Sequence, residues 1–141
     1  MTRSSVGEVR VQVKLTNAGD EILARRGQLS ADQVRALVTE ALVDTGAVRT
    51  VLPPDVVTRL GLGIRRQTVT EYADGRRETV GITEAIVVEL LGRDTFDDAL
   101  VLGDEVLIGQ TVLEKLDLLV DCRGPHLIPN PAHPDGPVSR V

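Results

Sequence analysis

Residues 42–53 read LVDTGAVRTVLP and place one acidic residue, Asp44, directly after an apolar run and directly before Thr45-Gly46. An ionised carboxylate is costly to bury unless hydrogen bonds or a proton compensate, so Asp44 belongs either to a solvated turn or to a reactive site. Two carboxylates that share one proton can serve as general base and general acid for a water molecule, and so hydrolyse an amide without a metal. One aspartate cannot fill both roles, so a catalytic Asp44 needs a second aspartate.

Strands are expected on both sides of this tripeptide. Residues 34–43 form a β-rich run that ends at Asp44, and residues 50–52 form a second short strand. Residues 53–61 predict a short helix, because two prolines open the segment and a glycine closes it. Within residues 69–82, Asp74-Gly75 between extended arms predicts a protruding hairpin, since both residues can take positive φ.

The N-terminal part is expected to begin with a strand and a hairpin. Residues 9–15 alternate between apolar and polar side chains, which places Val9, Val11, Val13 and Leu15 on one face of a strand. Residues 17–20 supply turn chemistry, and residues 21–24 can return as the partner strand.

The C-terminal half reads as short strands around one helix. Strands are predicted at residues 85–91, 99–102, 106–108 and 118–120, and a helix at 110–116 with Val112, Leu113 and Leu116 inward. Asp94, Asp97 and Asp98 are assigned to a solvated turn rather than a cation site. The tail from Gly124 carries five of the seven prolines and is expected to be extended or disordered.

Many short strands with one or two short helices indicate an all-β domain, and a closed or sandwich-like barrel is the physical expectation. The chain has 141 residues, 42% of them hydrophobic, which suits one domain with a sizeable core. Aromatic side chains are almost absent, and the net charge is −5. Both features argue against nucleic acid as a partner.

Cysteine and hydropathy indicate a cytoplasmic protein. Cys122 is the single cysteine, so an internal disulfide or a multi-cysteine metal site is excluded, and a buried or interface thiol is expected. His126 and His133 are interpreted as tail histidines rather than metal ligands. No signal core and no apolar run of membrane-spanning length is found, so no membrane partner is expected.

The segment Leu42-Val43-Asp44-Thr45-Gly46-Ala47, followed by residues 50–52, resembles the active-site segment of retropepsin-like (clan AA) aspartic proteases. The hairpin at residues 72–76 and the Leu107-Ile108-Gly109 segment before the helix at 110–116 follow in the order typical of that family. The whole pattern looks most like the small bacterial and archaeal single-domain members. The resemblance covers roughly residues 34–121 and implies a closed retropepsin-like β-barrel, the acid protease fold, within a domain of residues 1–123.

The resemblance also implies a homodimeric endopeptidase. One Asp-Thr-Gly in a chain of this length means that the second aspartate comes from another copy. Asp44 of each chain would activate water, Thr45 would hydrogen-bond to the partner's loop, and Gly46 would let backbone N–H groups approach the carboxylates. No metal or organic cofactor is implied, and the substrate would be a peptide or protein.

The family pattern further implies substrate contacts on both sides of the cleft. Ala47 and Val48 lie in the catalytic loop, the hairpin residues Tyr72, Ala73, Asp74 and Gly75 would form a flap over the peptide, and Leu107 and Ile108 would line a pocket or pack behind the loop. Tyr72 either hydrogen-bonds toward the aspartates or is a strand tyrosine with a half-buried ring. In relatives a C-terminal strand intertwines at the dimer interface, and residues 118–122 are the matching segment.

The sequence departs from retroviral members after Ala47. Val48 and Arg49 replace two acidic residues used there for substrate contact and an ion pair, and Gln110 replaces the basic partner. Two alternatives therefore stay open: a non-catalytic homodimeric β-module that binds an extended peptide or protein, and a structural oligomerisation domain.

Overall fold

The computed structural model describes residues 8–121 and 123–141, and in this range the chain is mostly β. Cys122, expected to be a buried or interface thiol, lies outside the described residues. The strands are β1 (Val9–Asn17), β2 (Ala36–Val43), β3 (Thr50–Leu52), β4 (Ile64–Glu71), β5 (Arg77–Thr83), β6 (Ile86–Leu90), β7 (Arg93–Asp97), β8 (Ala99–Val101), β9 (Val106–Ile108), β10 (Leu118–Asp121) and β11 (His126–Pro129). The helices are α1 (Ala18–Arg25), α2 (Pro54–Arg59) and α3 (Gln110–Leu116), with a 3-10 turn η1 (Ala31–Gln33).

Strand β1 is the longest described strand of the main sheet. It pairs antiparallel with β2 from Val9↔Val43 to Thr16↔Ala36, and its second half also pairs with β6. The described strands of this sheet run in the order β4-β5-β8-β3-β9-β2-β1-β6-β7, while β10 and β11 form a separate pair. The predicted alternation is confirmed, because Val9, Val13 and Leu15 are buried and Val11 is partly buried against the core, while Arg10, Gln12 and Lys14 are exposed.

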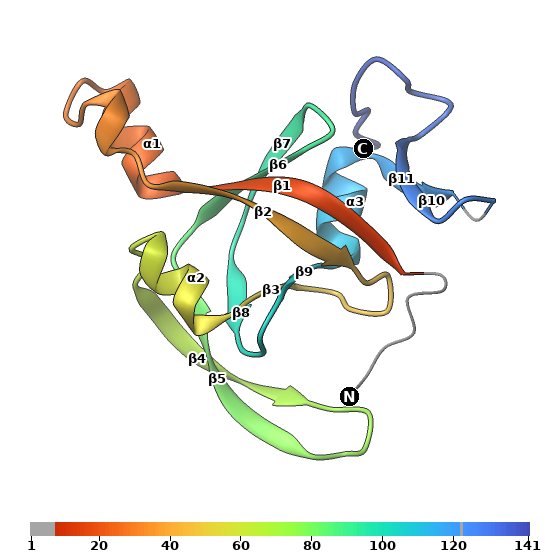
Figure 1. The fold of residues 1–141 in the computed structure, drawn as a ribbon, viewed down its shortest axis with the longest axis horizontal. Helices are drawn as coiled ribbons and strands as arrows, with labels where there is room; N and C mark the ends of the chain where they lie inside the picture. The colour runs from red at the N-terminus through yellow and green to blue at the C-terminus, as the bar shows by residue number, and fades with distance from the viewer. Residues whose placement is uncertain (1–7, 122) are drawn as a thin grey trace.

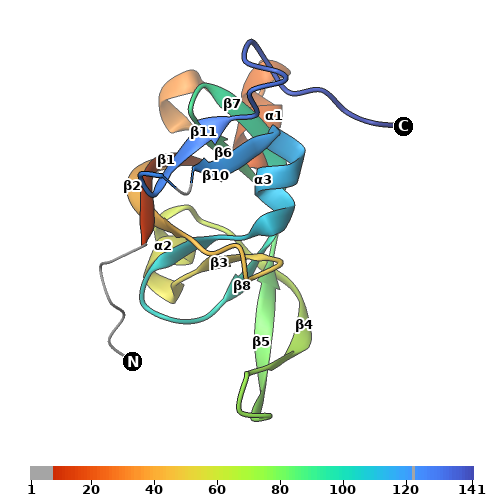
Figure 2. The ribbon, with the colours of Figure 1, turned by 90° about the vertical axis from the view of Figure 1, so that its right-hand side faces the viewer.

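The closed barrel predicted from the sequence is not found in the described part of the chain. Closure would need β4 and β7, the two ends of the strand order, to pair with each other, and no such pairing is present among the described strands. The β4–β5 hairpin instead extends away from the body, at the end opposite β10, β11 and α3 (Figure 1, Figure 2). At the other end α3 lies against β7, where Lys115 Nζ donates to the Phe96 carbonyl at 3.0 Å. The result is a bent, open sheet.

The core is built almost entirely from aliphatic side chains, as the near absence of aromatic residues requires. Val112, Leu113 and Leu116 of α3 are buried as predicted. Fully buried side chains come from several strands of the main sheet, from α3 and from the residue that ends α2, and they include Leu15, Leu52, Leu60, Ile86, Ile108 and Leu116, each with 0% exposure. A single contiguous core of this kind holds β2, β3 and β9 in place around residues 44–49.

The prediction of a hairpin at residues 17–24 is wrong, because this segment forms helix α1. The Asn17 side chain caps the helix by accepting from Asp20 N at 3.1 Å, and its amide donates to the Leu60 carbonyl at 2.8 Å. The Asp20 carboxylate then receives two hydrogen bonds from the Arg35 guanidinium at 2.8 and 3.0 Å. These contacts favour a helix over the turn that the same residue types also allow, and the partner strand of β1 is β2.

Residues 93–97 are a strand rather than part of a solvated turn. Leu91 and Gly92 both have positive φ, 50° and 75°, and turn the chain from β6 into β7. A leucine in this conformation is uncommon, and the sequence lacks the Asn-Gly or Asp-Gly that announces such turns. Asp94 and Asp97 therefore lie on β7, and only Asp98 follows it.

The tail folds back on the domain. β11 pairs with β10 from Leu118↔Pro129 to Asp121↔His126. The Asp117 carboxylate accepts hydrogen bonds from the Asn130 amide and the His133 ring, and these bonds hold the pKa of Asp117 below its usual value. The buried Arg93 guanidinium donates to the carbonyls of Leu116 and His133. The extended conformation is thus confirmed for β11, and the residues after it are tied to the end of α3.

Replacing Asp20 with asparagine should destabilise the protein in a pH-dependent way. The Arg35 hydrogen bonds lower the pKa of Asp20, so this pair stabilises the fold above the ordinary aspartate pKa of about 4 and ceases to do so as the pH falls through the lower, folded-state pKa. The free energy of unfolding of wild type and Asp20→Asn, measured in urea, should therefore differ most at neutral pH and converge under strongly acidic conditions.

Asp32→Asn is the matched control, because Asp32 is an exposed aspartate on η1. It should unfold like the wild type throughout. A difference between wild type and Asp20→Asn that stays constant from neutral to strongly acidic pH would contradict the role given to the Asp20–Arg35 pair.

Candidate active site

The acidic tripeptide lies where two parallel strands end together. β2 and β9 pair in parallel up to Val43↔Ile108, and the next amide, Asp44 N, donates to the Ile108 carbonyl at 3.0 Å. Asp44 is half-buried, whereas Thr45 and Gly46 are exposed. We call residues 44–49, which join β2 to β3, the Asp44 loop. The chain leaves the core directly after the buried Val43, which explains why an acidic side chain can follow an apolar run.

Backbone groups of the loop fix the orientation of the carboxylate. Gly46 N donates to Asp44 Oδ1 at 3.0 Å, and Ala47 N donates to the Asp44 carbonyl at 3.1 Å. A Cβ atom on residue 46 would lie 3.2 Å from the same carboxylate oxygen, so a glycine allows this close approach. A carboxylate held in this way is preorganised, since it need not reorient before it accepts a proton from water.

Helix α3 supports the loop from behind. Its first amides, Gln110 N and Thr111 N, donate to the carbonyls of Ala47 and Val48 at 2.8 and 3.1 Å. The helix can come this near because residue 109 is glycine: a Cβ there would be 2.8 Å from backbone atoms of Val48 and Arg49. The loop backbone is therefore fixed by β9 on one side and by α3 on the other.

An ion pair ties the far end of the loop to the β7–β8 turn. Arg49 Nη2 lies 2.6 Å from Asp98 Oδ1, and Thr50 Oγ1 donates to Asp97 Oδ2 at 2.7 Å. Asp97 and Asp98, two of the three acidic residues assigned to a solvated turn, thus hold the start of β3. Arg49 is therefore paired within the chain.

The predicted hairpin is present between β4 and β5, with exposed Ala73, Asp74 and Gly75 at its tip. Gly75 N donates to the Tyr72 carbonyl at 2.9 Å, and Tyr72 N donates to the Arg76 carbonyl at 2.8 Å. Gly75 has a φ of 85°, but Asp74 is not among the residues with positive φ. The turn is therefore a three-residue loop that needs one glycine, rather than the two-residue turn expected for Asp-Gly.

A cavity of about 510 Å³ brings together residues of the hairpin and of β9, and we call it the hairpin cavity. Of the predicted substrate-binding residues, Tyr72 and Leu107 line it. Val51, which pairs with Leu107 across β3 and β9, and Leu102 complete an apolar wall. Four charged residues also line this cavity, and sequence reasoning did not single them out: Glu8, Arg10, Asp104 and Glu105.

The other predicted substrate-binding residues lie outside this cavity. The Ile108 side chain has 0% exposure, and its carbonyl holds Asp44 N, so it supports the loop from the core. Val48, at 68% exposure, and the half-buried Ala47 belong to the surface of the Asp44 loop. The hairpin tip residues 73–75 are exposed at the end of the projecting hairpin.

Tyr72 uses its hydroxyl within the hairpin. The phenol donates to Glu78 Oε2 at 2.7 Å, and the Arg76 guanidinium lies over the ring at 4.4 Å from its centroid. The hydrogen bond to Glu78 raises the pKa of Tyr72, because it favours the protonated phenol. In the single chain Tyr72 is half-buried and lines the cavity. Its hydroxyl is bonded to Glu78.

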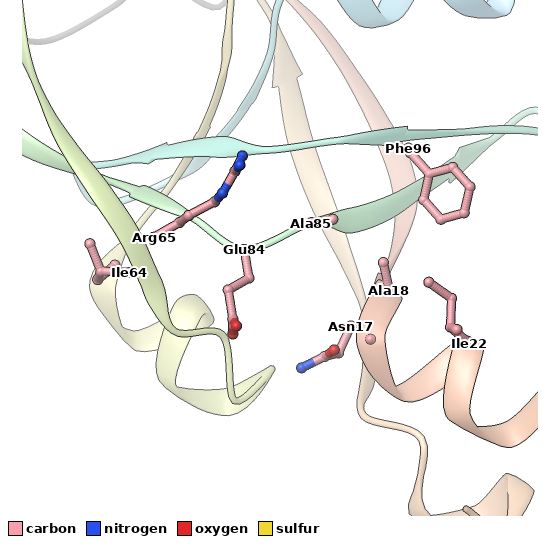
Figure 3. Close-up of a pocket in the computed structure, with 9 residues that line it drawn as sticks. Asn17, Ala18, Ile22, Ile64, Arg65, Glu84, Ala85 and Phe96 are labelled. Atoms are coloured by element: carbon pink, nitrogen blue, oxygen red, sulfur yellow. The ribbon is translucent and has the colours of Figure 1, made fainter. Parts of the chain in front are cut away.

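A larger cavity, of about 660 Å³, contains none of the predicted site residues. Figure 3 shows its lining, to which α1 contributes Ile22, β4 contributes Ile64 and Arg65, and β7 contributes Phe96. Its one carboxylate, Glu84, accepts a hydrogen bond from Gly63 N at 2.6 Å. Because none of the residues predicted for the site lines this cavity, the Asp44 loop remains the candidate active site.

Within the described part of the chain, His, Cys, Asp and Glu side chains form no group of three or more that could hold a metal ion. None of the helices in residues 8–121 and 123–141 has the length and apolar character that a membrane crossing requires.

A comparison with known families finds a match in this part of the chain. Residues 33–90 match the family model described as aspartyl protease. The matched span contains the Asp44 loop, α2 and the β4–β5 hairpin, and it ends with β6. No curated protein matches the chain. The family match confirms the resemblance to retropepsin-like aspartic proteases predicted from the sequence.

Replacing Gly109 with alanine should disturb the Asp44 loop. The added Cβ would overlap the backbone of residues 48 and 49, so either α3 or the loop must move, at a cost of about 1–3 kcal/mol in the free energy of unfolding. Gly136→Ala is the control, because a Cβ at residue 136 meets nothing within 4 Å. Urea unfolding compares the two variants, and equal stability would contradict the close approach of α3 to the loop.

The raised pKa of Tyr72 can be tested directly, because Tyr72 is the single tyrosine of a chain without tryptophan. Glu78→Gln removes the charge that favours the protonated phenol, so the midpoint of phenolate absorbance should move to lower pH. Glu71→Gln is the control on the same hairpin, since Glu71 pairs with Arg77. A midpoint that is the same in wild type and Glu78→Gln would exclude this hydrogen bond.

Proposed function

We propose that this chain, whose residues 33–90 belong to the aspartyl protease family, is a homodimeric endopeptidase that hydrolyses peptide bonds with a water molecule held between the Asp44 carboxylates of two copies. The observation that carries the proposal is the fixed Asp44 loop. Its carboxylate is oriented by Gly46 N, and its backbone is held by the Ile108 carbonyl and by the first amides of α3.

The chemistry requires two copies. A water molecule that attacks an amide must lose a proton to a base while an acid protonates the carbonyl oxygen or the leaving nitrogen. The chain contains one Asp-Thr-Gly, so the second carboxylate comes from the same residue of a partner. A two-fold axis beside Asp44 supplies it, because an isologous contact brings identical residues face to face.

The surface of the loop suits such a contact. Thr45 and Gly46 are exposed at its tip, and Val48 leaves 68% of its surface exposed in the single chain. Covering this aliphatic side chain with a second copy is favourable, because it removes apolar surface from water. In the dimer, the Thr45 hydroxyl would hydrogen-bond to the partner's loop, so that both carboxylates keep a fixed separation.

The reaction then follows from the pair of carboxylates. Two such groups a few ångströms apart cannot both be ionised, so together they hold one proton. The ionised member removes a proton from water, which attacks the peptide carbonyl, while the protonated member stabilises the gem-diol intermediate by hydrogen bonding. Collapse of the intermediate breaks the C–N bond, and the leaving amine takes its proton from the pair.

The hairpin provides the means to hold an extended peptide. It projects from the body beside the hairpin cavity, and exposed backbone at residues 73–75 can pair with the main chain of a substrate, a contact that tolerates varied side chains. Closure over the peptide would exclude water from the reacting bond.

The alternative is a homodimeric module that binds an extended peptide without cleaving it. It is favoured by Val48 and Arg49, which stand where retroviral relatives have acidic residues, and by the in-chain pair between Arg49 and Asp98. Two facing aspartates have no use in a binding groove, so the intact Asp-Thr-Gly favours the enzyme. A purely structural oligomerisation domain does not need the hairpin cavity.

Replacing Asp44 with asparagine should abolish peptide cleavage. Asparagine has nearly the same shape but cannot take up or release the proton, so the rate should fall by about 100- to 10,000-fold or more. Wild type and Asp44→Asn are incubated with a mixed peptide library from acidic to neutral pH, and cleavage is followed by mass spectrometry.

Asp94→Asn is the control, because Asp94 is an exposed aspartate on β7, outside the Asp44 loop. It should cleave like the wild type, and all three proteins should sediment as dimers. A monomeric protein at every concentration, or a library left intact by both wild type and Asp44→Asn, would overturn the proposal.

A further inference from the structure

We infer that the hairpin cavity receives a basic side chain, lysine or arginine, of the peptide substrate; this inference rests on the proposed endopeptidase function. The cavity combines an apolar wall with an excess of carboxylates. Its lining includes Tyr72 of the hairpin and Leu107 of β9.

The cavity lies next to the Asp44 loop in the fold. Leu107, which lines the cavity, directly precedes Ile108, whose carbonyl accepts from Asp44 N. Val51, which pairs with Leu107, belongs to β3, the strand that follows the Asp44 loop. A peptide that lies across the loop beneath the hairpin can therefore direct one side chain into this cavity.

The charges around the cavity are unbalanced. Three carboxylates, those of Glu8, Asp104 and Glu105, face one guanidinium, that of Arg10. Arg10 also pairs with Glu40, which is not among the cavity-lining residues: Arg10 Nη1 lies 3.3 Å from Glu40 Oε1. A cleft lined mainly by one sign of charge concentrates its field, so this cavity attracts cations and repels anions.

Glu105 is only loosely paired: its side chain is 41% exposed, and one of its two carboxylate oxygens is buried. Its Oε1 atom is buried and has no hydrogen-bond donor among the described residues. The Arg10 Nη2 atom is 3.9 Å away, beyond hydrogen-bond distance, whereas Glu8 lies 3.3 Å from the same guanidinium. A carboxylate with one buried oxygen and a loose ion pair gains more from a nearby cation than a fully hydrated one, because water reaches only part of it.

The apolar wall fits the remainder of a basic side chain. Lysine and arginine carry a three- or four-carbon stem that packs on apolar surface while the charged group reaches a polar site. Val51, Leu102, Leu107 and the Tyr72 ring can contact the stem, and Asp104 and Glu105 can contact the charged group. A volume of about 510 Å³ is ample for one such side chain. Neither a purely aliphatic nor an acidic side chain satisfies both parts of this lining.

The test varies one side chain of a cleaved peptide among lysine, arginine, norleucine and glutamate. Norleucine keeps the stem of lysine and lacks the charge. Wild type should cleave the lysine and arginine peptides with a kcat/KM about tenfold above that of the norleucine peptide, and the glutamate peptide should be the poorest substrate. The preference should fall as ionic strength rises.

The variants Glu105→Gln and Asp104→Asn should each reduce the preference for lysine over norleucine, the ratio of the two kcat/KM values, by about three- to tenfold. Glu89→Gln is the matched control, because Glu89 is an exposed glutamate on β6 outside the cavity, and it should keep the wild-type preference. Asp104 is exposed, so its substitution tests the inference even if Glu105→Gln folds poorly.

A second readout does not depend on cleavage. In the Asp44→Asn protein, binding of the same peptides can be followed by the fluorescence of Tyr72, the single tyrosine, which lines the cavity. Lysine and arginine peptides should bind about tenfold more tightly than the norleucine peptide, and adding Glu105→Gln should remove most of this difference.

The outcomes separate the two proposals. Cleavage without any preference for lysine or arginine over norleucine would overturn this inference and leave the endopeptidase in place. Tight binding of lysine peptides that requires Glu105, with no cleavage by wild type, would support the cavity's choice of side chain and overturn the proposed hydrolysis. If the protein neither binds nor cleaves basic peptides, this inference is overturned as well.

Discussion

The structure depends on the place where β2 and β9 end side by side. Parallel pairing up to Val43↔Ile108 continues into one further hydrogen bond, from Asp44 N to the Ile108 carbonyl. Gly109 then lets α3 approach the backbone of residues 48 and 49 closely enough for its first amides to bind loop carbonyls. An acidic side chain at the end of a buried strand is tolerable only because this arrangement brings it to the surface at once and gives its oxygen a backbone donor.

Charged side chains around the aliphatic core hold neighbouring elements together. Asp20 with Arg35 fixes α1, Arg49 with Asp98 fixes the start of β3, and Arg93 binds the end of α3 to the tail. In these three contacts the charged groups are paired or bonded to carbonyls, which is the condition for keeping charge near a core. The hairpin cavity is different, since its carboxylates outnumber its one guanidinium.

Much of the site could be predicted from the sequence because its signals are local. Asp-Thr-Gly after an apolar run, Asp74-Gly75 between extended arms, and Gly109 before the helix each fix a turn or an approach through the properties of one or two residues. The same local chemistry also misled. Asn17, Gly19 and Asp20 suit a turn as well as a helix start, and the choice was made by Leu60 and Arg35, which are distant in sequence. The turn at Leu91-Gly92 carried no recognisable signal.

By itself the sequence determined the β-rich class, the aliphatic core, the acidic loop with its flanking strands, and the family to which that loop points. Alternation and turn chemistry act within a few residues, so they can be read without coordinates. Only the tertiary structure decided that the sheet stays open, that the tail binds the end of α3, and that Glu8, Asp104 and Glu105 meet in one cavity. These facts depend on contacts between residues far apart along the chain, and no local pattern encodes which distant carboxylates will face one another.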